Sequence, residues 1–156
     1  MALKPDRTEL LTSIDFFMNE TGNRGSVVFF SNGNLTAGGG SGSSMDDANA
    51  LVKLADSPTG LPVGILLNDV VNLDLTRQHI NYAKDEVQKG GKVCILQEGV
   101  IVTDVISGTP LVGNVVGSDA NGNLTVGVNA STTVKIGRWL SKKDADGYAK
   151  AHINIQ

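Results

Sequence analysis

Alternation of apolar and polar residues in the last third of the chain constrains the fold more than any other feature. Residues 149–155, AKAHINI, alternate small or apolar side chains with polar ones, and 124–128 (LTVGV) and 134–137 (VKIG) do the same. Successive side chains of a strand point to opposite faces, so each segment predicts a half-buried strand. Clusters of turn formers at 118–122 and 144–147 separate these segments. Short strands at this spacing predict a mainly β fold, either a small barrel or a sandwich.

Further strands are predicted upstream of this region. The apolar run 63–67 is one strand, and 93–96 and 100–106 are two more. The last two are separated by Gln-Glu-Gly at 97–99, a hairpin-sized break that contains glycine. The composition agrees, because 19 glycines with only 4% aromatic residues are typical of many turns and thin layers.

A short internal echo indicates shared turn chemistry. The pentapeptide NGNLT occurs at 32–36 and again at 121–125. Asn-Gly is the preferred pair for a type I′ hairpin turn, because both residues tolerate positive φ. The echo therefore predicts two hairpins with similar turns, and it is too short to indicate a duplicated domain.

One short helix is expected within an otherwise β-rich body at 45–156. Ser44 precedes Asp47 by three residues, which is a loose capping-box pattern at a helix start. An apolar face at helical spacing follows, made of Ala48, Leu51, Val52 and Ala55. The run SPTG at 57–60 is expected to end this helix.

Residues 1–44 are predicted to form a separate N-terminal segment. Apolar stretches at 14–18 and 26–30 flank a loop rich in turn formers, which indicates two strands joined by a loop. An extended arm that lies on another subunit is the alternative, and 1–12 suits it better. The stretch GGGSGSS at 38–44 has the composition of a flexible linker, and it lacks the Lys-Ser/Thr ending of a phosphate-binding loop.

Residue types that carry catalysis or hold metals are too scattered to predict such a site. The chain has two histidines, His79 and His152, and one cysteine, Cys94. His152 lies on the polar face of the last predicted strand, and Cys94 in an apolar strand is expected to behave as a small buried hydrophobe. The acidic turn at 144–147 lacks the other ligands of a calcium loop. We expect no enzymatic activity, no cofactor and no metal site.

The charge pattern argues against two classes of partner. The formal net charge is -3, and no Lys/Arg cluster exceeds the pair Lys142-Lys143. Nucleic-acid binding normally needs a concentrated basic face. No apolar run approaches the roughly 20 residues that cross a bilayer. We therefore expect neither nucleic acid nor membrane as a partner, and the lone cysteine is typical of a protein made in a reducing cytoplasm.

Trp139 and its neighbour Arg138 are candidates for a protein–protein contact. They lie in a segment where Ile136 and Leu140 have the opposite parity to Trp139. If that parity faces the core, Trp139 faces outward, and an exposed Trp beside Arg is a composition favoured at interfaces. Packing of Trp139 inside the fold is the alternative.

Two segments resemble sequences found in virion proteins of tailed bacteriophages. The first is DLTRQHIN at 74–81 with its continuation at 84–93. The second is IGRWLS at 136–141 followed by DADGYAK at 144–150. With the β pattern between them, the resemblance covers residues 61–156 and is to head decoration, or capsid cement, proteins.

This resemblance implies a small β-barrel or β-tulip protein on the outer face of the virion head, made in the host cytoplasm. It implies binding to the major capsid protein as a homo-oligomer, with a trimer favoured and a dimer as the alternative. Such a protein bridges capsid subunits and stabilises the mature shell. A carbohydrate-binding or host-adhesion module displayed on the virion is the competing hypothesis. The predicted contacts lie in the N-terminal segment and around the tryptophan: Leu3, Pro5, Leu10, Leu11, Arg138 and Trp139.

Overall fold

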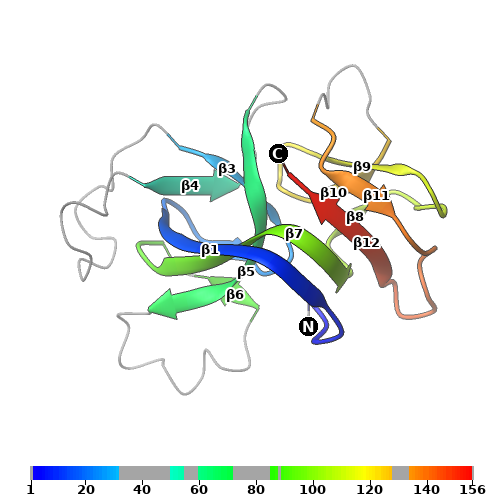
Figure 1. Cartoon of the computed structure of the whole chain (residues 1–156), viewed down its shortest axis with the longest axis horizontal. Coiled ribbons are helices and arrows are strands. Elements are labelled where there is room, and N and C mark those ends of the chain that lie inside the picture. Colours follow the sequence, from blue (N-terminus) through cyan, green and yellow to red (C-terminus); the bar gives the residue numbers. More distant parts are fainter. Residues whose placement is uncertain are drawn as a thin grey trace.

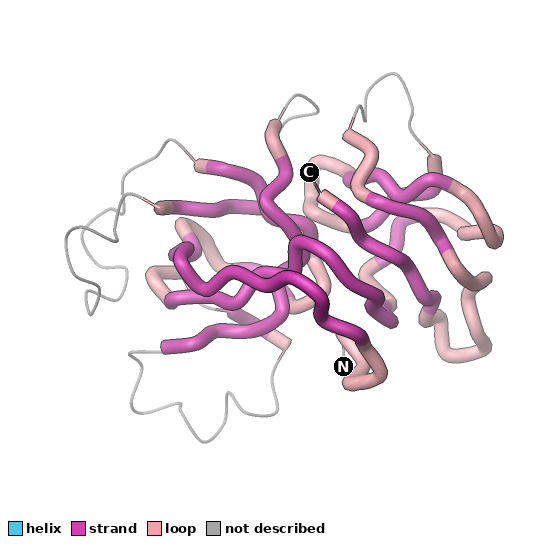
Figure 2. The backbone as a smooth tube through the Cα atoms, in the orientation of Figure 1, coloured by secondary structure: helices cyan, strands magenta, loops and turns pink. Residues whose placement is uncertain are grey.

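The fold consists of strands and the loops that join them. The structure, a computed structural model, describes residues 2–31, 50–54, 60–71, 85–87, 89–127 and 134–155. Every regular element within these ranges is a strand and none is a helix, as the trace in Figure 2 shows. The prediction of a mainly β chain is confirmed.

Ten of the strands form one sheet (Figure 1). In chain order they are β1 (Thr8–Met18), β3 (Val27–Phe30), β4 (Leu51–Leu54), β5 (Pro62–Val71), β7 (Lys92–Thr103), β8 (Ile106–Ser107), β9 (Val115–Ser118), β10 (Leu124–Val126), β11 (Gly137–Trp139) and β12 (Ala149–Asn154). A separate two-stranded sheet pairs β2 (Gly22–Asn23) with β6 (Glu86–Val87).

The order across the large sheet is β1-β4-β3-β5-β7-β12-β11-β9-β10-β8. β1 also pairs antiparallel with β7, so the pairings on one side of the sheet return to β1. The other side stops at β8, which pairs in parallel with β10. The sheet as a whole is therefore not closed as a barrel, and of the predicted architectures the sandwich-like one describes the fold. β7 lies between the group of strands β1, β4, β3 and β5 and the group β12, β11, β9, β10 and β8 (Figure 1).

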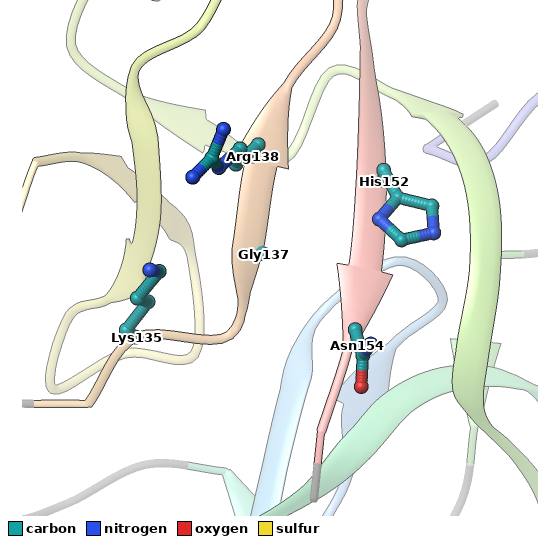
Figure 3. A pocket seen from close by; sticks show the side chains of 5 residues that line it. All are labelled: Lys135, Gly137, Arg138, His152 and Asn154. Atoms are coloured by element: carbon teal, nitrogen blue, oxygen red, sulfur yellow. The ribbon is translucent and has the colours of Figure 1, made fainter.

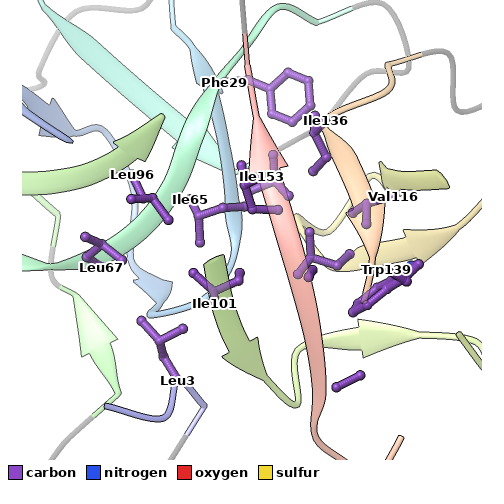
Figure 4. Close-up of a cluster of buried hydrophobic side chains, with 14 residues drawn as sticks. Leu3, Phe29, Ile65, Leu67, Leu96, Ile101, Val116, Ile136, Trp139 and Ile153 are labelled. Atoms are coloured by element: carbon purple, nitrogen blue, oxygen red, sulfur yellow. The ribbon is translucent and has the colours of Figure 1, made fainter. Parts of the chain in front are cut away.

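Apolar side chains pack in two clusters, one on each side of β3 and β5. On β3, Val27 and Phe29 belong to the larger cluster, whereas Val28 between them belongs to the smaller one. On β5, Ile65 belongs to the larger cluster and Leu66 to the smaller. A strand buried on both faces has apolar residues at consecutive positions, which explains the uninterrupted apolar runs of these two strands. Figure 4 shows the larger cluster, where side chains of β5 and β7 face those of β11 and β12.

The predicted helix is wrong where it falls on described residues. Leu51–Leu54 is strand β4, which pairs in parallel with β1 and antiparallel with β3. Leu51 and Val52 are consecutive and both are buried, a pattern that suits a strand covered on both faces. A short apolar run of this kind fits helix and strand periodicity equally, and pairing with two neighbouring strands decides between them. Ala48 and Ala55, the other members of the predicted helical face, lie outside the described residues.

The hairpin predicted at 97–99 is also wrong, because β7 runs through this position without a turn. A Cβ atom on Gly99 would lie 2.2 Å from the backbone oxygen of Thr8. Gly99 therefore lets β1 approach β7 closely, and the register of β1 shifts beside it, between Glu9 and Leu11. Glycine inside a strand often marks such a close approach or a bulge.

A hairpin does form at the second copy of the NGNLT pentapeptide, where β9 pairs with β10. Gly122 has a φ of +79°, but no other residue type among the described residues has positive φ, so the turn is not type I′. The Asp119 carboxylate organises it instead, since its Oδ1 accepts hydrogen bonds from the backbone N–H groups of Asn121 (2.9 Å) and Asn123 (2.8 Å). The first copy, at 32–36, lies outside the described residues.

The acidic turn at 144–148 has the same design. Asp144 Oδ1 accepts hydrogen bonds from the backbone N–H of Asp146 at 3.0 Å and of Tyr148 at 2.8 Å. The hydrogen bond from the Tyr148 N–H is the main cause that lowers the pKa of Asp144 below its usual 3.8. Gly147 supplies the positive φ, +88°. This carboxylate is thus a turn former, in agreement with the sequence interpretation.

The N-terminal segment packs on the rest of the chain. The apolar stretches predicted as strands are β1 and β3, but they do not form a hairpin, because β4 lies between them. Thr8 pairs with Val100 of β7, and β1 continues along β7 to Phe17. An arm laid on another subunit remains a proposal for assembly, whereas within this chain β1 belongs to the sheet.

Candidate functional site

The structure divides the six predicted contact residues into two groups. Leu10 and Leu11 are 63% and 51% exposed, and Pro5 and Arg138 are exposed as well. Leu3 and Trp139 are only 3% and 0% exposed. Exposure of Trp139 is therefore a wrong prediction, and the alternative, that it packs in the core, is confirmed.

Trp139 is buried because the strand that carries it begins later than the sequence suggests. β11 starts at Gly137, so the buried Ile136 precedes the strand and does not set its alternation. Within β11, Gly137 and Trp139 are buried and Arg138 is exposed. The indole Nε1–H donates a hydrogen bond to the backbone oxygen of Thr125 at 3.2 Å, which satisfies its one polar atom inside the core.

Leu3 is held in the core by the end of β7. Its backbone forms an isolated bridge with Thr103, and the N–H of Lys4 donates to the Val102 oxygen at 2.9 Å. The Thr103 hydroxyl donates to the oxygen of Ala2 at 2.7 Å. These contacts bury Leu3 in the larger cluster, so it is not available at the surface of this chain.

Leu10 and Leu11 lie at an irregularity in the register of β1. Glu9 pairs with Gly99 and Leu11 pairs with Glu98, so Leu10 is an extra residue on the β1 side. A bulge of this kind sets two residues against one on the partner strand and re-aims their side chains. Ile14, further along the same strand, is 48% exposed.

The sheet register brings two of the exposed predicted residues, Leu11 and Arg138, to one face. Arg138 pairs with His152, His152 pairs with Val100, and Val100 pairs with Thr8. In the next row Asn154 pairs with Glu98, and Glu98 pairs with Leu11. Directly opposed residues of antiparallel strands share a face. We call this outward surface of β11, β12, β7 and β1 the four-strand face, defined by Arg138, His152, Val100, Thr8, Asn154, Glu98 and Leu11.

A shallow pocket of about 360 Å³ opens at the β11–β12 end of the four-strand face, and Lys135, Gly137, Arg138, His152 and Asn154 line it (Figure 3). We call it the basic pocket. A Cβ on Gly137 would lie 2.0 Å from the backbone oxygen of His152, so the glycine allows β11 to lie tightly against β12. Lys135, Arg138 and Asn154 are exposed, and His152 is half-buried on the polar side of β12, as its alternation predicts.

Sequence reasoning found Arg138 but missed Lys135, His152 and Asn154 as its neighbours. The alternation at 149–155 placed His152 and Asn154 on the polar face of one strand. This alternation does not show that the strand pairs with β11. Alternation is a local pattern and predicts only which residues of one strand share a face. The pocket also depends on which strands are neighbours in the sheet.

The residue types that ligate metals stay scattered in the described part of the chain. Within those ranges, no three His, Cys, Asp or Glu side chains lie close enough together to hold a metal ion. Burial raises the pKa of the Cys94 thiol on β7, and a thiol kept neutral is a poor nucleophile. His79 lies outside the described ranges. The same part of the chain contains no helix of the length and apolarity that crossing a membrane requires.

A comparison with protein families matches residues 19–155 to the XM1 gp53 minor capsid protein. The chain belongs to this family. Membership of the XM1 gp53 family makes it a structural protein of a bacteriophage capsid, which confirms the virion assignment of the sequence resemblance. The matched range includes all of the four-strand face except its β1 edge. A search of curated proteins gives no match.

Proposed function

We propose that this capsid protein binds the outer surface of the mature phage head and bridges major capsid subunits, without enzymatic activity. The observation that supports this role is the four-strand face, where the exposed Leu11 of β1 shares one surface with polar and basic side chains. Apolar anchors beside polar side chains are the composition of protein interfaces.

Binding to the assembled shell is the physical source of stabilisation in this proposal. A protein that binds the mature lattice but not dissociated subunits shifts the equilibrium toward the lattice by mass action. Assembly of this chain into a homo-oligomer, with a trimer favoured over a dimer, raises the number of contacts per bound particle and hence the avidity.

The competing hypothesis of a displayed carbohydrate-binding module has less support. Such a module is expected to present aromatic rings as a platform, and Trp139 is fully buried. Tyr148 is half-buried, and its ring is covered by Lys4, whose Nζ lies 4.0 Å from the ring centroid. Tyr82 lies outside the described residues. We therefore propose the capsid-binding role alone.

Co-sedimentation with purified heads tests the proposal. Expanded capsids and unexpanded precursors, both lacking this chain, are mixed with increasing amounts of purified protein, and the bound copies per particle are counted. We expect saturable binding to expanded capsids only, at a stoichiometry that matches the capsid subunits. Failure to bind either particle contradicts the proposal.

A double variant tests whether the leucines of β1 are anchors. Leu10→Ser with Leu11→Ser removes apolar area that binding would bury, and we expect roughly 30-fold to 100-fold weaker attachment. The matched control is Leu111→Ser with Val112→Ser, since these residues are 51% and 66% exposed in a turn outside the four-strand face. Equal loss in both variants would show that exposed apolar area in general, and not this face, governs binding.

A further inference from the structure

We propose that the basic pocket binds an acidic segment of the capsid partner, one that carries Asp or Glu side chains. This inference rests on the proposed capsid-binding function and assigns a ligand chemistry to one part of the four-strand face.

The charges of the pocket are not neutralised within the described part of the chain. Other cationic residues there form ion pairs with carboxylates, among them Lys4, Arg7, Arg24 and Lys150. No ion pair among the described residues uses Lys135, Arg138 or His152, and none of the described residues that line the pocket is a carboxylate. Two uncompensated cations therefore share one pocket of a chain whose formal charge is -3.

The strands hold the pocket in a fixed geometry. Arg138 and His152 are direct cross-strand partners, so their Cβ atoms lie roughly 5 Å apart. Trp139, which follows Arg138 in the chain, is buried and donates a hydrogen bond to the Thr125 oxygen. These contacts fix β11 to the core beneath the pocket. Groups held in place before binding lose less conformational entropy when a ligand arrives.

The chemistry of the lining favours a carboxylate. The Arg138 guanidinium can engage both oxygens of a carboxylate with two parallel hydrogen bonds, and the Lys135 ammonium adds a second positive charge. The Asn154 amide both donates and accepts hydrogen bonds, which suits the backbone of a peptide. The pocket volume, about 360 Å³, is at the small end of ligand sites and suits a few side chains.

The surroundings favour a peptide over a nucleic acid. A phosphate backbone needs a track of cations, and the basic pocket provides only a small cluster. Glu98 of β7 pairs directly with Asn154 of β12, so a track of phosphates that continued along the face would meet a negative charge. The exposed Leu11 follows Glu98 in the same row, and an apolar contact there suits a protein partner.

The test compares two double variants in the capsid co-sedimentation assay. Lys135→Gln with Arg138→Gln removes both cations from the pocket, and Lys142→Gln with Lys143→Gln removes two cations that lie outside its lining. All four substitutions lower the charge equally. We expect the pocket variant to bind expanded capsids about 10-fold to 100-fold more weakly, with three- to tenfold from each cation, and the control to bind as the wild type does.

Outcomes of this assay separate the inference from the function on which it rests. If wild type and both variants attach equally, the pocket inference is overturned and the capsid-binding role stands. An equal loss in both variants also overturns it, because net charge alone then accounts for binding. If the wild type itself does not attach, the proposed function fails. A peptide assay then tests whether the pocket binds acidic side chains.

The peptide assay measures fluorescence anisotropy of a labelled octaglutamate with the full chain. An octaglutamine peptide and an eight-nucleotide oligothymidylate are the reference probes. Preference for octaglutamate, reduced about tenfold or more in the pocket variant only, supports the inference. Equal binding of the oligothymidylate, or no binding of octaglutamate, overturns it.

Discussion

The indole of Trp139 fills the region of the larger cluster where β9, β10, β11 and β12 meet. Its burial is complete, and its Nε1–H reaches the Thr125 oxygen of β10. The neighbouring Arg138 points to the opposite side and stays exposed. One residue step on β11 thus separates a core anchor from a surface charge.

Trp139→Phe tests this anchor. The change removes buried volume and leaves the Thr125 oxygen without its donor, so we expect the free energy of unfolding to fall by about 2–4 kcal/mol. Urea unfolding monitored by far-ultraviolet circular dichroism gives the value. The control is Arg138→Gln, an exposed neighbour for which we expect a change within about 0.5 kcal/mol. Similar losses in both variants would contradict the anchoring role.

Strand β7 pairs with three other strands. β1 lies along one of its edges, and β5 and β12 share the other. Gly99 falls where β1 approaches most closely, and its neighbour Glu98 faces Leu11. The close approach of β1 to β7 therefore depends on a glycine of the partner strand.

Gly99→Ala is expected to push β1 away from β7. A Cβ at 2.2 Å from the Thr8 oxygen cannot be accommodated without movement of the backbone, and we expect a loss of about 2–3 kcal/mol in unfolding free energy. Hydrogen exchange of the β1 amides should accelerate more than that of β12. In the control, Gly113→Ala, φ is +87° with no atom within 4 Å, so only the backbone cost of about 1 kcal/mol is expected. Unchanged β1 exchange in Gly99→Ala would contradict the close-approach argument.

The sequence predicted strands from alternation and from uninterrupted apolar runs, but it failed for the short apolar run at 51–54. The alternation at 149–155 predicted β12 correctly, and the apolar run at 63–67 predicted part of β5. Leu51 and Val52 were assigned to a helix because consecutive buried residues carry no period-2 signal. The glycine at 99 was taken for a turn because local sequence does not show that another strand passes there.

At the scale of the whole molecule, Asp85 connects distant parts of the chain. Burial raises the pKa of its carboxyl, but hydrogen bonds from the Ala2 backbone and the Arg24 guanidinium outweigh burial and lower the pKa below 3.8. The Arg24–Asp85 ion pair measures 3.0 Å beside the β2–β6 sheet. Residues near 2, 24 and 85 are thereby held together.

The lowered pKa gives a pH dependence of known sign. A carboxyl whose pKa is lower in the folded state stabilises the fold above the unfolded pKa, near 3.8, and loses this contribution as the pH falls through the folded pKa. We expect Asp85→Asn to be less stable than the wild type above about pH 4 and the difference to shrink as the pH falls further. Thermal unfolding across this range measures it, with Asp15→Asn as an exposed control. A constant difference at all pH values would contradict the linkage.

The candidate site was less predictable than the fold, because it depends on which strands become neighbours. Leu11 and Arg138 were each suggested by local composition, but only the row through β12 and β7 places them on one face. Leu3 and Trp139 were named as contact residues, with a core position left open for Trp139, and both are buried because local sequence does not show which apolar residues the core takes up.

The pairing of β1 with β7 also has a consequence for how the chain is made. Thr8 cannot pair with Val100 until Val100 has been synthesised. At ordinary bacterial rates of synthesis this takes roughly 5–20 s. During that time Leu10, Leu11 and Ile14 have no β7 partner strand. Polar and charged residues are interspersed with these apolar ones: Glu9, Thr12, Ser13 and Asp15. Such residues disfavour pairing of the unpaired strand with another nascent chain.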